Sequence, residues 1–73
     1  MSAHSIATHR IETELSAIPT SLLPVLTADR ARMAAILAEE LSAITTSERD
    51  SYLKQIRAAE LTRYVKLLPR AAA

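Results

Sequence analysis

A chain of 73 residues with no cysteine, no glycine and a formal net charge of +1 is one small domain without disulfides, thiolate metal sites or glycine-rich phosphate loops. Hydrophobic residues make up 49% of the chain, but 14 of them are alanine and only Tyr52 and Tyr64 are aromatic. Helix-forming residues dominate the rest. We therefore expect a single all-α domain over residues 1–73, with a core so small that it favours oligomerisation or a partner.

The spacing of apolar residues predicts a first helix over about residues 5–18. Its apolar residues recur every three or four positions and so share one side: Ala7, Ile11, Leu15 and Ile18. Pro19 ends the helix, because proline has no amide hydrogen to donate. Residues 1–4 are expected to fray.

The connector over residues 19–26 is more apolar than a solvated loop, since it contains Leu22, Leu23, Val25 and Leu26. Something must cover these side chains. Either the connector folds over the helices that follow, or it anchors another chain. A variant interpretation starts the second helix at Ser21, with Pro24 in its first turn.

The second helix is expected over about residues 28–44. Thr27 is the predicted N-cap, with an acid in the first turn at Asp29. The apolar stripe of this helix comprises Met33, Ile36, Leu37, Leu41 and Ile44. Because the chain has no glycine, we do not expect a left-handed glycine cap.

The third helix is expected over about residues 46–68. Thr45 to Glu48 matches the capping box, a hydroxyl followed three residues later by glutamate, and Pro69 ends the helix. The joint to the second helix is very short, which predicts an antiparallel αα-hairpin. Residues 70–73 are expected to fray.

Charged residues lie within the predicted contact faces, where a carboxylate needs a partner. A hairpin turning near Thr45 sets Arg30 opposite Glu60, and Glu40 near Arg49 or Lys54, which predicts two ion pairs. These pairs either fix the register of the hairpin or leave an acid for a basic residue of a partner. The apolar arc of the third helix is also too wide for one neighbour to cover, so helix one or another subunit must cover the rest.

The sequence gives little support for catalysis or metal binding. His9 and Glu12 are three residues apart, in the reverse of the order that carboxylate-bridged metal sites use, and His9 is expected in solvent. His4 lies on the apolar face near the chain end. We expect no enzyme, no cofactor and no metal. No run of 18 apolar residues is present, so a soluble, cytoplasmic protein without membrane contact is expected.

The leading hypothesis is a non-catalytic interaction protein that binds itself, a larger protein or both, as an adaptor, co-chaperone, inhibitor or accessory subunit. Its binding would follow the helix-in-groove mode. Tyr64 ranks first, because aromatic residues at the centre of an interface often carry much of its binding energy. The predicted partner-binding residues are Leu22, Leu23, Leu26, Leu53, Ile56, Glu60, Tyr64, Leu67 and Leu68.

The alternative is a small dimeric regulator that binds nucleic acid through the basic third helix. Arg63, Lys66 and Arg70 share one side of that helix. Lys54 and Arg57 occupy another side, so no single stripe tracks a phosphate backbone. Salt dependence separates the two functions, because phosphate binding weakens steeply with salt and apolar docking does not.

Overall fold

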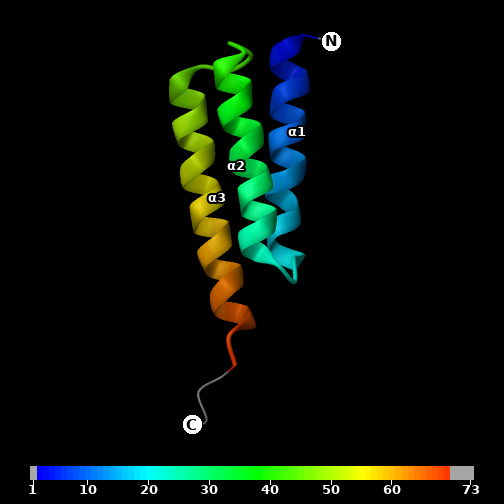
Figure 1. The fold of residues 1–73 in the computed structure, drawn as a ribbon, viewed down its shortest axis with the longest axis vertical. Helices are drawn as coiled ribbons and strands as arrows, with labels where there is room; N and C mark the ends of the chain where they lie inside the picture. The colour runs from blue at the N-terminus through cyan, green and yellow to red at the C-terminus, as the bar shows by residue number, and fades with distance from the viewer. Residues whose placement is uncertain (1, 70–73) are drawn as a thin grey trace.

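The computed structural model describes residues 2–69, which form three α-helices and one short 3-10 helix. In chain order these are α1 (Ala3–Ala17), η1 (Ile18–Thr20), α2 (Pro24–Glu40) and α3 (Thr46–Leu67). The described residues contain no strand, and the all-α prediction is confirmed. Figure 1 shows that successive helices run in opposite directions, that α2 packs against both α1 and α3, and that α3 extends past the ends of the other two.

The first helix follows the predicted stripe. Ile11 and Ile18 are fully buried, and Ala7 and Leu15 are partly buried beside them. The helix begins earlier than predicted because Ser2 caps it, its Oγ accepting from the Ser5 amide at 3.1 Å. Residues 2–4, which were expected to fray, form the N-cap and the first residues of α1; Met1 lies outside the described residues.

The second helix begins at Pro24, four residues before the predicted start. Proline suits the first turn, where its missing amide hydrogen costs no hydrogen bond. Thr27 thus lies inside the helix and is not its N-cap. Its hydroxyl lies 2.7 Å from the Ser21 hydroxyl and donates to the Leu23 carbonyl. The variant interpretation, with Pro24 in the first turn, comes closer to the structure.

The second helix also ends four residues early, at Glu40, because Ser42 turns into the left-handed region with φ 60°. The Ala43 amide then donates to the Ala38 carbonyl (2.8 Å) and the Ser42 amide to the Glu39 carbonyl (2.9 Å). These two bonds make a Schellman cap. A glycine-free chain thus forms a left-handed cap with serine at the position that glycine usually takes.

Replacing Ser42 by glycine is expected to stabilise the fold by about 1 kcal/mol, because a side chain in the left-handed region costs ~1–2 kcal/mol. Thermal denaturation should show a rise in Tm of roughly 4–8 °C. The matched control is Ser51→Gly in the exposed interior of α3, which should lower stability by about 0.5 kcal/mol. A lower Tm for Ser42→Gly would contradict the strain at this cap.

The third helix begins as predicted. Thr45 Oγ1 accepts from the Glu48 amide (3.1 Å), and Glu48 Oε1 accepts from the Thr45 amide (2.9 Å). The capping box is therefore confirmed. The helix ends at Leu67, one residue from the predicted end, and the expected fraying at residues 70–73 concerns residues outside those described.

Isoleucine and alanine build the core. Ile11 and Ile44 pack at one end, and Ile18 and Ile56 pack at the other. Apart from Pro24 at its start, the buried residues of α2 are all alanines: Ala28, Ala31, Ala35 and Ala38. Small side chains there let α1 and α3 both approach the α2 backbone closely.

Most of the apolar stripe predicted for the second helix faces away from the core. Met33, Leu37 and Leu41 are 58%, 47% and 80% exposed, Ile36 is also exposed, and only Ile44 is buried. The alanines and the larger residues both repeat at helical spacing, so periodicity does not choose between them. Packing against two neighbours favours the alanine side, which leaves the larger residues outside.

Candidate docking surfaces

The first candidate surface is the outer face of α2. It consists of exposed large apolar residues with one charge of each sign among them: Leu26, Arg30, Met33, Ile36, Leu37, Glu40 and Leu41. Large apolar residues are expected on a covered face, and exposed apolar patches mark interaction sites in soluble proteins. The outer face of α2 therefore has the composition of an interface.

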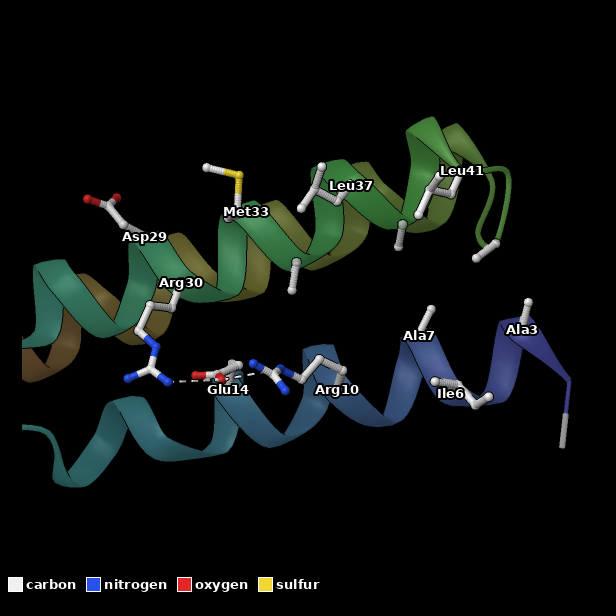
Figure 2. Close-up of a pocket in the computed structure, with 13 residues that line it drawn as sticks. Ala3, Ile6, Ala7, Arg10, Glu14, Asp29, Arg30, Met33, Leu37 and Leu41 are labelled. Atoms are coloured by element: carbon white, nitrogen blue, oxygen red, sulfur yellow. Dashed lines mark ion pairs between the residues drawn. The ribbon is translucent and has the colours of Figure 1, made fainter.

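A groove of about 840 Å³ runs between α1 and α2, beside this outer face (Figure 2). Ile6 and Ala7 line its apolar end from α1, and Leu37 and Leu41 line it from α2. Sequence reasoning missed Ile6 as a surface residue and assigned the two leucines to the core. The alanine stripe on the opposite side of α2 was the signal that could have found them.

A charged cluster occupies the other end of the groove. Glu14 Oε1 lies 3.4 Å from Arg10 Nε and 3.6 Å from Arg30 Nη2 (Figure 2). The Glu14 side chain is mostly buried, whereas both guanidinium groups are largely exposed. Two arginines share one carboxylate, so the cluster has an unbalanced positive charge.

The second candidate surface is the C-terminal end of α3, hereafter the α3 end. Leu61, Tyr64, Val65 and Leu68 are exposed there at spacings of three, one and three residues. Leu67 is exposed beside them. The last part of α3 extends past α1 and α2 (Figure 1), whereas η1 and the connector contact the side of α3 that carries Arg63.

The predicted partner-binding residues separate into two groups. The exposed ones are Leu22, Leu23, Leu26, Tyr64, Leu67 and Leu68. Ile56 is fully buried and Leu53 is partly buried against both core clusters, so these two residues hold the fold together. Glu60 is mostly buried in an ion pair within the chain.

Two ion pairs were predicted between the second and third helices. In each of them the prediction names the wrong residue of α2. Glu60 pairs with Arg32 and not with Arg30, and Arg49 pairs with Glu39 at 3.1 Å and not with Glu40. The Glu60 hydrogen bond is the main cause that raises the pKa of Arg32. Because the alanines face inward, α2 is rotated so that Arg32 and Glu39 face α3, which leaves Arg30 and Glu40 outside.

Of the residues of the nucleic-acid alternative, Arg63 and Lys66 line one pocket on α3, together with Pro19 of η1. Arg63 is partly buried and its Nε donates to the Ser21 carbonyl at 2.8 Å, which attaches the connector to α3. Lys66 is exposed. Arg70 lies outside the described residues.

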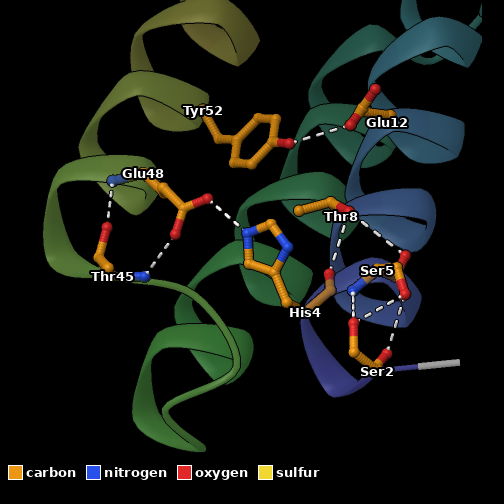
Figure 3. Close-up of polar contacts among 8 residues, drawn as sticks. All are labelled: Ser2, His4, Ser5, Thr8, Glu12, Thr45, Glu48 and Tyr52. Carbon is orange, nitrogen blue, oxygen red and sulfur yellow. Dashed lines mark hydrogen bonds and ion pairs between the residues drawn. The ribbon is translucent and has the colours of Figure 1, made fainter.

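Polar contacts link α1 to the start of α3 (Figure 3). His4 Nε2 lies 2.6 Å from Glu48 Oε2, and the Tyr52 hydroxyl donates to Glu12 at 3.0 Å. The His4 contact, followed by the Thr45 amide, lowers the pKa of Glu48. Burial, followed by the Glu12 hydrogen bond, raises the pKa of Tyr52. These contacts hold α1 against the start of α3.

Within residues 2–69, no three histidine, aspartate or glutamate side chains gather as a metal-binding group. In the same range, no helix has both the length and the apolarity that crossing a bilayer requires. Comparisons with protein-family models, with curated proteins and with solved structures found no match. The outer face of α2 and the α3 end are therefore the features from which a function is proposed.

Proposed function

We propose that this protein is a non-catalytic interaction module, acting as an adaptor, co-chaperone, inhibitor or small accessory subunit, that docks onto a larger protein through the α3 end. The observation that carries the proposal is the exposed row Leu61, Tyr64, Val65 and Leu68. Its spacing of i, i+3, i+4 and i+7 is the pattern of a helix that inserts its apolar face into a groove.

The position of the row supports this role. The last part of α3 extends past the other helices (Figure 1), so a groove can cover its exposed apolar side, while the connector contacts the opposite side through Arg63. The capping box and the buried Ile56 hold the remainder of α3 in place. The docking segment is thus ordered before binding, which reduces the entropy lost on association.

The exposed basic residues of α3 favour a partner with an acidic surface. Lys54, Arg57 and Lys66 are exposed and form no ion pair among residues 2–69, whereas the nearby acid Glu60 is already paired with Arg32. A complementary surface is an apolar groove with an acidic rim, since opposite potentials steer association. We therefore expect an acidic partner protein.

The connector supplies a second anchor. Leu22 and Leu23 are exposed, and the bond from Arg63 to the Ser21 carbonyl holds the connector against α3. The two leucines thus keep a defined position relative to the α3 end. A partner that covers both buries more apolar area than a single helix offers.

Replacing Tyr64 by alanine is expected to weaken binding to the partner by about 2 kcal/mol, or roughly 30-fold, because truncating an aromatic anchor removes much of the contact. A partner isolated with the wild-type chain from its source cells would be titrated by calorimetry against both chains. The matched control, Ile6→Ala, changes an exposed apolar residue of α1. Equal affinities for Tyr64→Ala and wild type would reject the α3 end as the docking surface.

The same titration tests the alternative of nucleic-acid binding. Apolar docking should change little as salt rises, whereas phosphate binding should fall linearly on a log–log plot. A steep salt slope with duplex or single-stranded nucleic acid, lost on Lys66→Glu, would favour the alternative.

A further inference from the structure

The outer face of α2 has the spacing of a coiled-coil seam. Leu26, Arg30, Met33, Leu37 and Glu40 follow one another at intervals of four, three, four and three residues, as alternating a and d positions do. All five are exposed. Within residues 2–69, no helix covers the seam.

The charges of the seam are placed symmetrically. Arg30 and Glu40 are each five residues from position 35, and Met33 and Leu37 are each two residues from it. If two copies of α2 run antiparallel about this point, Arg30 of each copy lies level with Glu40 of the other. Met33 and Leu37 then share the central layers, as a and d residues do in antiparallel pairs.

A parallel pair places the same residues very differently. Arg30 would lie level with Arg30 of the second copy, and Glu40 with Glu40 of the second copy. Like charges at matched seam positions disfavour such an arrangement. The charge pattern of α2 therefore selects a second copy in the antiparallel orientation.

Both charged residues can reach a second copy, although Arg30 also pairs with Glu14. Glu40 has no ion pair among residues 2–69. Arg30 is 64% exposed and lies 3.6 Å from Glu14, which Arg10 also contacts at 3.4 Å. If Arg30 turns to an acid on a second copy, Arg10 still pairs with Glu14.

We infer that the outer face of α2 is a homodimer interface, on which a second copy of this chain packs antiparallel with reciprocal Arg30 to Glu40 ion pairs. This interface goes beyond the proposed function and does not depend on it. Because α3 ends at the end of the bundle where α2 begins and extends beyond it (Figure 1), the dimer carries two α3 ends that point in opposite directions. Two partner molecules can then bind one dimer.

Charge reversal tests the interface by sedimentation equilibrium at low salt, over a wide range of protein concentration. Glu40→Arg alone and Arg30→Glu alone each turn both ion pairs into like-charge contacts, so each should weaken dimerisation by about tenfold or more. An equimolar mixture of the two variants restores opposite charges at both contacts and should form a heterodimer. The double variant R30E/E40R should dimerise like the wild type.

The matched control is Lys54→Glu, which reverses an exposed charge on α3 away from the seam and should leave dimerisation unchanged. Circular dichroism verifies that each variant keeps its helices. A monomeric wild type, or single reversals that dimerise as well as the wild type, would overturn the proposal. Tyr64→Ala should dimerise normally while losing its partner, so failure of the dimer and failure of the proposed function give different results.

Discussion

Replacing Ile56 by alanine is expected to unfold most of the isolated chain. Ile56 is fully buried between α1, η1 and α2, and truncating a buried isoleucine costs about 2–5 kcal/mol through lost burial and the cavity left behind. The core of a chain of this size rarely supplies more than roughly 3–5 kcal/mol. One such loss therefore removes most of the stability.

Urea denaturation followed by circular dichroism measures this effect. All variants are compared at one protein concentration, because dimerisation would make stability depend on concentration. The control is Val65→Ala, which truncates an exposed apolar residue of the same helix and should change stability by less than about 0.5 kcal/mol. A stable Ile56→Ala variant would mean that α3 is held mainly by contacts other than this core.

Enlarging the inner face of α2 is expected to destabilise the fold almost as much. Ala35 is fully buried beside Ile11 and Ile44, so a leucine there must push α1 or α3 away from α2. Overpacking of this kind costs about 1–3 kcal/mol. Ala35→Leu increases hydrophobicity and should nevertheless lower the urea midpoint.

The matched control for this prediction is Ala58→Leu, the same substitution at an exposed site of α3. Leucine and alanine are both good helix formers, so the control should stay within about 0.5 kcal/mol of the wild type. If Ala35→Leu were as stable as the control, the outer face of α2 would be the true core side, and the interface proposed for it would be lost.

Local signals predicted much of the secondary structure. The capping box from Thr45 to Glu48 places the start of α3 correctly, and Pro69 follows its end. These signals work because the hydrogen bonds they make lie within a few residues. The ends of α2 were missed because Pro24 and Ser42 both depart from the simplest rules, one by starting a helix and the other by capping it without glycine.

Only some of the residues predicted to bind a partner lie on the surface. Tyr64 and Leu68 are exposed: Tyr64 lies in the last turn of α3 and Leu68 is its C-cap. Ile56 is not exposed, because η1 and α2 cover it. Exposure along one helix depends on the length of its neighbours, which periodicity does not report.

By itself, the sequence determined three helices, the capping box at the start of α3 and a core too small for the apolar residues that the chain carries. Only the tertiary structure decided which side of α2 faces inward. Ala35 and Leu37 lie on stripes with the same period, and the choice depends on how closely two other helices approach. That packing rotates α2, pairs Arg32 rather than Arg30 with Glu60, and leaves a heptad seam exposed. Long-range contact therefore decides whether a given apolar stripe is core or interface.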